Sequence, residues 1–385
     1  MDAVRAVNAL TARWAEVERG APGTVLSGLG VWPLLAFLAT GAEGRVRAGL
    51  ERAVGAPAGR GAQQARELIA LLKGTEGVGA AVGLWTAEDL VLGAEWLAGL
   101  PADSHGRLKD GRVTEGPDFD AWASRHTDGL VPRFPLRPTP WTRLVLASAL
   151  AVRTTWHHPF TEGPLSPSAG PWAGLRLAGL RLAVPAVDLR PGGLLLRETS
   201  AGPVTELRLP GTGGVEVRLL LGVEGAEPGA VLAAALTAPE GGVPMAELPD
   251  GEPGPGLVVG IADGTGPGDQ LLVTTVPFRV SADHDLLARA ELFGLGAPGP
   301  FPGISPADPL VVGAAAQAAT AEFSAEGFRA GVVTAVAMRR GMPLLRRVRT
   351  VRVAFDRPFA WVAVHRATGM AMVAGWHTEP VPAAR

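Results

Sequence analysis

Residues 316–359 read AQAATAEFSAEGFRAGVVTAVAMRRGMPLLRRVRTVRVAFDRPF, and this stretch decides how the rest of the chain is interpreted. It passes from an acidic strand end through Gly327 into small residues, and then into seven arginines between positions 339 and 357. Strand alternation after Gly327 places one set of side chains on a single face: Phe328, Ala330, Val332, Thr334, Val336 and Met338. The stretch fits a strand with one buried face, yet its Arg-Arg-Gly-Met centre is typical of an exposed loop. We interpret it as a candidate conformational switch.

Composition limits the classes of function that the chain can have. Of its 385 residues, 47% are hydrophobic, which is enough for a large core, and the net charge of −2 argues against a nucleic-acid partner. For the arginine-rich stretch we favour a solvated loop and strand over a patch that binds a polyanion. The absence of cysteine excludes disulfides, thiolate catalysis and cysteine-bound zinc.

The sequence gives no sign of a membrane or export segment. Residues 1–17, MDAVRAVNALTARWAEV, form an amphipathic pattern without the apolar centre of a signal peptide. No apolar run is long enough to span a bilayer without a charge or a proline. We therefore expect a soluble, cytoplasmic protein with no membrane partner.

The first part of the chain predicts mostly helices. An amphipathic helix is expected over 3–18, followed by an almost wholly apolar helix that Ser27 caps and Gly41 ends. The predictions that follow are helices at 43–53 and 62–73, a strand at 77–87, a helix at 88–100, a loop at 101–117, a short helix within 118–134 and a continuous apolar strand at 142–156.

The second part of the chain is rich in strand patterns. Short apolar runs between glycines and prolines indicate strands over 160–280, interrupted by an exposed loop at 238–269 that is rich in proline and glycine. A helix is expected at 285–295, and a hairpin at 359–376 that turns at Arg366–Gly369. Because helices come first and strands later, the fold class is α+β.

We predict no cofactor and no metal. His157 and His158 are adjacent, so their side chains point apart in a strand, and no third ligand lies near them in sequence. Two glycine-rich segments, GVGAAVG at 77–83 and GTGPGD at 264–269, only partly resemble phosphate loops. The first lacks a third glycine at the required spacing, and Pro267 interrupts the second.

Several segments form an ordered set that is more specific than any one of them. They are DFDAWASRHTDGLV (118–131), LVLASALAVRTTWHHPF (144–160), VTELRLP (204–210), DLLARAELFGLG followed by FPGIS (285–305), and RVAFDRPFAWVAVHRATGMAMVAGWHTEP (352–380). Together they cover nearly the whole chain and resemble the serpin superfamily, in a form of bacterial type. The resemblance implies one domain over 1–385, with three β-sheets, about eight or nine helices and an exposed reactive-centre loop near 327–350.

The activity that the resemblance implies is inhibition of a serine protease by a metastable monomer acting as a suicide substrate. The protease would cut the loop, and the cut loop would insert into the main sheet. The scissile region carried over to this chain is Arg339, Arg340, Gly341 and Met342. The insertion hinge carried over is Gly327, Phe328, Arg329, Ala330, Gly331, Val332, Val333, Thr334 and Ala335. An arginine at the cut implies a trypsin-like protease, whereas Met342 suits a protease with an apolar pocket, such as a subtilisin-like one.

The chain departs from the family pattern at several positions. Ser27, Ser148 and Gln317 occupy the positions of the usual polar cluster under the sheet opening, with Gln317 in place of a histidine. Ala325 and Phe278 stand where an acid and a lysine commonly pair, and Phe328 is bulky where a small residue is usual. These departures favour an alternative: a scaffold that does not inhibit, but serves as a binding module or as an accessory or catalytic protein of a biosynthetic pathway.

Overall fold

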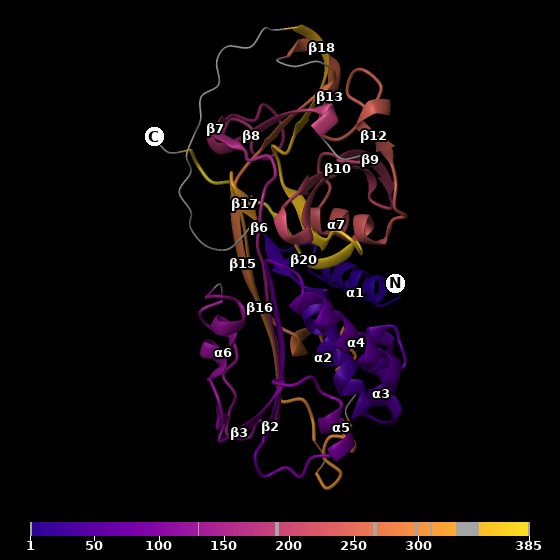
Figure 1. Ribbon diagram of the computed structural model, residues 1–385, viewed down its shortest axis with the longest axis vertical. Helices are drawn as coiled ribbons and strands as arrows, with labels where there is room; N and C mark the ends of the chain where they lie inside the picture. Colours follow the sequence, from indigo (N-terminus) through magenta and orange to yellow (C-terminus); the bar gives the residue numbers. More distant parts are fainter. Residues whose placement is uncertain are drawn as a thin grey trace.

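The computed structural model describes residues 2–129, 131–188, 192–264, 268–296, 299–308, 310–328 and 346–383. Over these ranges the chain forms three β-sheets and seven α-helices (Figure 1). The helices are α1 (Asp2–Glu18), α2 (Gly28–Thr40), α3 (Gly44–Val54), α4 (Ala58–Lys73), α5 (Ala94–Ala98), α6 (Phe119–His126) and α7 (Pro228–Thr237). None of the described helices is long and apolar enough to cross a bilayer.

Helix α2 lies at the centre of the core because nearly all of its side chains are apolar. Every residue from Gly28 to Ala39 is buried. The Ser27 side chain accepts a hydrogen bond from the backbone N–H of Gly30, which satisfies a donor that the first turn would otherwise leave unpaired. The indole of Trp32 donates to the carbonyl of Val54 at 2.8 Å, and this bond ties α2 to the end of α3.

The longest sheet has eight strands, in the order β4-β3-β2-β5-β16-β17-β6, with β15 on the far side of β16. Helices α2 and α4 contact one face of this sheet and α6 contacts the other. Its central strand β5 is apolar except for Ser148 and is buried along its whole length. The strands are β2 (Val78–Ala87), β3 (His105–Lys109), β4 (Arg112–Val113), β5 (Leu144–Val152), β6 (Thr154–Thr155), β15 (Phe278–Asp285), β16 (Ala314–Phe323) and β17 (Gly327–Phe328).

Two smaller sheets complete the architecture. The seven-stranded sheet, which α1 and α7 contact, has the order β1-β20-β19-β11-β10-β9-β12. Its strands are β1 (Thr24–Leu26), β9 (Leu194–Thr199), β10 (Gly202–Pro210), β11 (Val215–Leu221), β12 (Val243–Pro244), β19 (Phe359–His365) and β20 (Met370–His377). The five-stranded sheet has the order β13-β18-β14-β8-β7. Its strands are β7 (Thr161–Leu165), β8 (Leu177–Pro185), β13 (Leu257–Gly264), β14 (Gln270–Thr275) and β18 (Arg346–Ala354).

The predicted α+β class with three sheets is confirmed, with seven α-helices in the described ranges where eight or nine were expected. The helix predicted at 88–100 is present only as the short helix α5. It begins later than predicted because Gly93 donates its N–H to the carbonyl of Ile304, which ties the preceding residues to a distant loop. The helix predicted at 285–295 is only a 3-10 turn at Leu287–Arg289, followed by turns that bury Phe293 against Trp14.

Two predicted loops contain strands. The stretch 101–117 includes β3 and β4, because Leu84 to Ala87 of β2 pair in parallel with residues 105–108. The stretch 238–269 includes β12 and β13. In β13 Leu257 and Val259 are buried while Val258 is exposed, an alternation that the surrounding prolines and glycines obscured.

Candidate functional site

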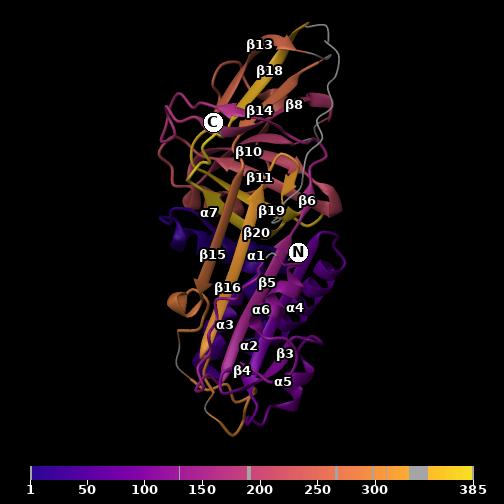
Figure 2. The ribbon, with the colours of Figure 1, turned by 90° about the vertical axis from the view of Figure 1, so that its left-hand side faces the viewer.

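The eight-stranded sheet has a partial opening between β5 and β16. These two strands are parallel and pair over five positions, from Ala314↔Val145 to Ala318↔Ala149. β16 runs on to Phe323 and β5 to Val152, but the pairing between them stops at Ala318. Figure 2 shows β16 and β5 running along each other through the middle of the molecule. The opening lies beyond the last paired position.

The predicted hinge begins at this opening. β17 is antiparallel to β16, at Phe323↔Phe328, and antiparallel to β6, at Gly327↔Thr155. A Cβ on Gly327 would lie 2.2 Å from the carbonyl oxygen of Thr154, so only glycine fits this pairing. Gly327 and Phe328 therefore form a short strand seated between β16 and β6.

Phe328 is buried in the core. Its side chain is 2% exposed, and its ring lies 5.4 Å from that of Trp361. Backbone bonds hold the preceding turn, with Trp156 donating to the carbonyl of Glu326 at 2.9 Å. The other predicted hinge positions, Arg329–Ala335, and the predicted scissile region, Arg339–Met342, lie outside the described residues.

Ser27, Ser148 and Gln317 meet in one buried hydrogen-bonded cluster beside the last paired positions. The Gln317 side chain accepts from the N–H of Ser27 at 2.8 Å and donates to the carbonyl of Ser27 at 3.0 Å. It also donates to the hydroxyl of Ser148 at 3.2 Å, across the line between β16 and β5. Gly30 closes over the cluster: a Cβ there would lie 2.7 Å from Gln317 Nε2 and 2.9 Å from Ser148 Oγ. The cluster joins the start of α2 to both strands.

His284 is a neighbour of this cluster that sequence reasoning missed. It lies directly opposite Gln317 in the β15–β16 pairing, so the two side chains share a face of the sheet. Its Nε2 lies 2.9 Å from the carbonyl oxygen of Val25, and its ring meets Trp14 edge-on at 4.9 Å. His284 lies beside Gln317 because of the register between β15 and β16, and this register cannot be read from the sequence.

An aromatic cluster occupies the place of the missing ion pair. Phe278 stacks on Phe323 at 5.3 Å and on Trp361 at 5.5 Å. Ala325 is buried, and its carbonyl accepts from the N–H of Phe160 at 2.7 Å. Ring packing and backbone bonds therefore hold the top of the sheet, where the family pattern has opposite charges.

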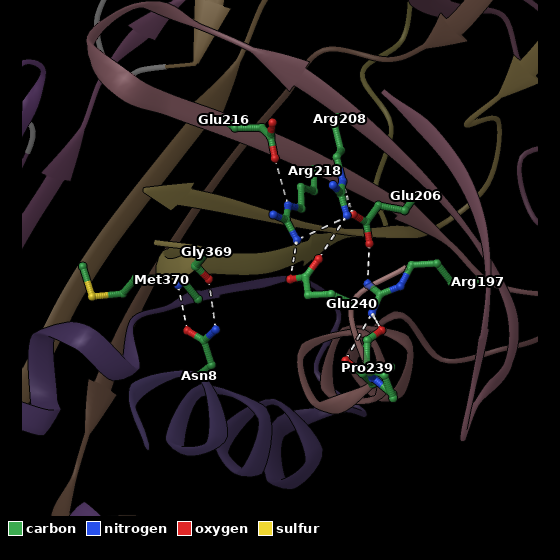
Figure 3. Close-up of polar contacts among 12 residues, drawn as sticks. Asn8, Arg197, Glu206, Arg208, Glu216, Arg218, Pro239, Glu240, Gly369 and Met370 are labelled. Atoms are coloured by element: carbon green, nitrogen blue, oxygen red, sulfur yellow. Dashed lines mark hydrogen bonds and ion pairs between the residues drawn. The ribbon is translucent and has the colours of Figure 1, made fainter. Parts of the chain in front are cut away.

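A charged cluster under α1 and α7 is a second feature that sequence reasoning did not find (Figure 3). Glu206 on β10 is fully buried and forms ion pairs with Arg197, Arg208 and Arg218. Burial by itself raises the pKa of Glu206, but the charges of Arg218, Arg208 and Arg197 outweigh it and hold the pKa below its usual value. The four residues come from three strands, so no local sequence motif indicates this cluster.

On the solvent-facing side of this charged cluster, the ion pairs formed by Glu240 are long. Glu240, whose side chain is 72% exposed, lies 3.4 Å from Arg208 Nη2 and 3.7 Å from Arg218 Nη1. Arg197 is buried, and its Nε has no hydrogen-bond partner among the described residues. Asn8 of α1 borders the same cleft and bonds to Gly369 at 3.0 Å. Across the described ranges, no group of three or more histidines and acids could hold a metal ion.

Comparison with known proteins identifies the architecture. No protein-family model and no curated protein matches the chain. Human thyroxine-binding globulin with its thyroxine ligand is 16% identical, covers 98% of both chains and has a TM-score of 0.70. Native protease nexin-1 with heparin is 16% identical over 98% of both chains, with a TM-score of 0.69.

A third similar structure is Serpin48, a highly specific serpin of the insect Tenebrio molitor. It is 15% identical, covers 98% of this chain and 97% of its own, and has a TM-score of 0.68. The chain therefore has the serpin fold. At these identities the likeness establishes the fold alone.

Proposed function

We propose that the protein inhibits a serine protease as a suicide substrate, by insertion of its cut reactive segment into the eight-stranded sheet. One observation carries the proposal: β17 is antiparallel to both of its neighbours and points into the gap between β16 and β5. A segment that continues β17 would enter that gap as a new antiparallel strand. Insertion of this kind is an established behaviour of serpins.

The strand pairings give insertion a driving force. Before insertion, β5 and β16 share five parallel pairs, and their edges beyond Ala318 and Ala149 are unpaired with each other. A new strand between them replaces this ladder by two antiparallel ladders, which are somewhat more stable per residue and pair more of the backbone. A protease held as an acyl-enzyme at the cut end is then carried along with the inserting strand.

Insertion also has a specific barrier. Neighbouring strands lie about 4.8 Å apart, so a new strand moves β5 and β16 to about twice that separation. The 3.2 Å bond from Gln317 to Ser148 cannot survive this change, whereas both bonds from Gln317 to Ser27 stay on one side of the gap. The cluster of Ser27, Ser148 and Gln317 is thus proposed as the latch of the sheet.

The target protease follows from the predicted cut. Arg339 or Arg340 at the cut would select a trypsin-like enzyme, and Met342 an enzyme with an apolar pocket. The protein would act as a cytoplasmic monomer.

The deciding experiment compares the uncut protein with protein cut once between Arg339 and Met342. We expect the melting temperature to rise by tens of degrees on cutting, and a panel of trypsin-like and subtilisin-like proteases to include one that forms a complex stable in denaturing gels. An unchanged melting temperature together with no such complex would refute the proposal.

A second candidate function is binding of a small anionic molecule, and the charged cluster of Figure 3 favours it. A ligand carboxylate that displaces Glu240 would face Arg208 and Arg218. Thyroxine-binding globulin, which shares the fold, was solved with a small molecule bound. Thermal shift with a panel of aromatic and aliphatic carboxylates tests this function. Stabilisation that is stronger in Glu240→Gln than in the native protein would support it, and no shift in either would refute it.

A further inference from the structure

The segment that follows β20 crosses from the seven-stranded sheet to the five-stranded sheet. β20 ends at His377, and residues 378–383 continue outside the sheet of β20. We call these residues the C-terminal tail. Backbone pairing joins the tail to the first residues of β8: Ala178 donates to the carbonyl of Val381 at 2.9 Å, Ala383 donates to the carbonyl of Arg176 at 3.0 Å, and Leu177 forms a β-bridge with Pro382.

The tail takes a position on β8 that β14 leaves free. β14 pairs with β8 only from Leu180 to Pro185, so the same edge of β8 before Leu180 has no partner in β14. The tail supplies that partner, and the N–H of Ala178 is thereby satisfied. Trp172 holds the start of the tail as well, because its indole N–H donates to the carbonyl of Thr378 at 3.0 Å.

His377, the residue from which the tail departs, lies in a cage of aromatic rings. Its side chain is 4% exposed. Its ring centre lies 5.2 Å from that of Phe278, 5.8 Å from that of Trp172 and 6.0 Å from that of Phe359. Its Nε2 is buried and has no hydrogen-bond partner in the part of the chain that the structure describes. Trp172 therefore contacts the caged ring and holds the tail at the same time.

The cage admits the neutral imidazole and disfavours the charged one. Charged residues occur on or beside the elements that pack around the ring, at Arg176, Arg279, Arg357 and Glu379. Burial is nevertheless the cause that lowers the pKa of His377, from 6.5 to about 4. The stacked face of Phe278 attracts a cation, but this attraction is weaker than the cost of removing an imidazolium from water. The ring is therefore neutral at pH 7.

We infer that His377 is an acid-sensitive switch for the C-terminal tail: once protonated, its ring leaves the aromatic cage, and the tail detaches from β8. Detachment frees the chain end and leaves the N–H of Ala178 and the carbonyl of Arg176 on an open edge of the five-stranded sheet. The inference does not depend on protease inhibition, because it uses neither the reactive segment nor the gap between β5 and β16.

The size of the effect follows from the two protonation equilibria. In the detached tail the imidazole has its ordinary pKa of 6.5, whereas in the cage the pKa is about 4. The detached form therefore binds more protons between these values, and detachment becomes about twentyfold more favourable at pH 5 than at pH 7. Above pH 6.5 the tail stays paired with β8.

Hydrogen exchange on the full-length protein tests the switch. The readout is the protection factor of the Ala178 and Ala383 amides, which divides the intrinsic exchange rate at each pH by the observed rate. In the native protein both protection factors should fall about twentyfold from pH 7 to pH 5. His377→Phe keeps an aromatic ring in the cage that cannot be charged, so its protection factors should not fall.

His105→Phe is the matched control. Burial and the charge of Arg107 also lower the pKa of His105 to about 4, but His105 lies on β3, at the opposite end of the molecule from β8 (Figure 1). This variant should keep the native fall in protection. Trp172→Phe keeps the ring contact but loses the bond to Thr378, so it should lower protection at both pH values and leave the fold-difference between them unchanged.

Two results would overturn the inference: equal falls in protection in the native protein and in His377→Phe, or no fall in the native protein. The NMR signal of the His377 ring in the native protein gives a test without any substitution. The signal of the protonated ring should appear over the same pH range in which the two amides lose protection. Loss of protection while the ring stays neutral would also overturn the inference.

Discussion

Replacement of Ser148 by alanine removes the side-chain bond between β16 and β5 that insertion must break in addition to their backbone pairing. The hydroxyl accepts from Gln317 Nε2 at 3.2 Å inside a fully buried site, and Gln317 keeps its second acceptor, the carbonyl of Ser27. Losing this bond should cost the uncut protein about 1 kcal/mol. The cut and inserted protein has already lost the bond, so its stability should not change.

The difference in stability between uncut and inserted Ser148→Ala gives the expected change in the rate of insertion. A cost of about 1 kcal/mol corresponds to a rate of insertion up to about fivefold higher, if the bond is fully broken in the transition state. For a chain of 385 residues, the melting temperature of the uncut protein should fall by only about 1–2 °C. The rate of inhibition, measured with the protease that the panel identifies, is therefore the more sensitive assay.

Ser281→Ala is the matched control for this prediction. The Ser281 hydroxyl bonds to Thr320 at 3.0 Å between β15 and β16, which stay paired when a strand enters on the other side of β16. This control should leave the insertion rate unchanged. If Ser148→Ala destabilises the cut and uncut forms equally, or accelerates insertion no more than Ser281→Ala, the cluster is not a latch.

Three further predictions concern the core, its titrating groups and the hinge. Glu206→Ala should cost about 3–5 kcal/mol in chemical denaturation at pH 7, because it leaves Arg197 buried without its counter-charge. The folded pKa of Glu206 lies below its unfolded value of 4.5. The contribution of Glu206 to the free energy of unfolding is therefore complete above pH 4.5 and is lost as the pH falls through the folded pKa. An equal cost of Glu206→Ala at pH 3 and pH 7 would contradict this. Burial lowers the pKa of His377 from 6.5 to about 4, so the unfolded chain binds the extra proton between these values and the fold loses about 2 kcal/mol on going from pH 7 to pH 5. His377→Phe, placed among Phe278, Phe359 and Trp172, should flatten that part of the pH profile, and an unchanged profile would assign the loss to other groups. Gly327→Ala should unseat β17, because its Cβ would meet the Thr154 carbonyl at 2.2 Å; limited proteolysis near Phe328 should become faster, and native-like resistance would refute the seating.

The sequence predicts the parts of the fold that local chemistry decides. The run of apolar residues after Ser27 predicts a core helix with a serine cap. The run at Leu144–Val152, apolar except for Ser148, predicts a strand buried on both faces. The turn between Arg366 and Gly369 is likewise visible as a break between two apolar runs. In each case the type or the spacing of neighbouring side chains is sufficient to predict the element.

The rest depends on partners that are distant in sequence. β13 lies among prolines and glycines, and it becomes a strand because β18 offers it an edge. Residues 285–295 have helical spacing, but burial of Phe293 against Trp14 favours a tighter turn. The positions of Ser27, Ser148 and Gln317 could be named from a resemblance, whereas their mutual distances, the seat of Phe328 and the surroundings of Glu206 follow only from the three-dimensional arrangement.

The missing side chain of Gly30 has a consequence for how this chain can change over evolution. Any substitution there adds a carbon where Gln317 and Ser148 already stand, so these three positions cannot vary independently. A relative with alanine at position 30 should have a smaller residue at 148 or 317, and a relative that keeps both polar residues should keep the glycine. Correlated substitution at these positions would record, in sequence alone, how tightly α2 is fitted under the sheet.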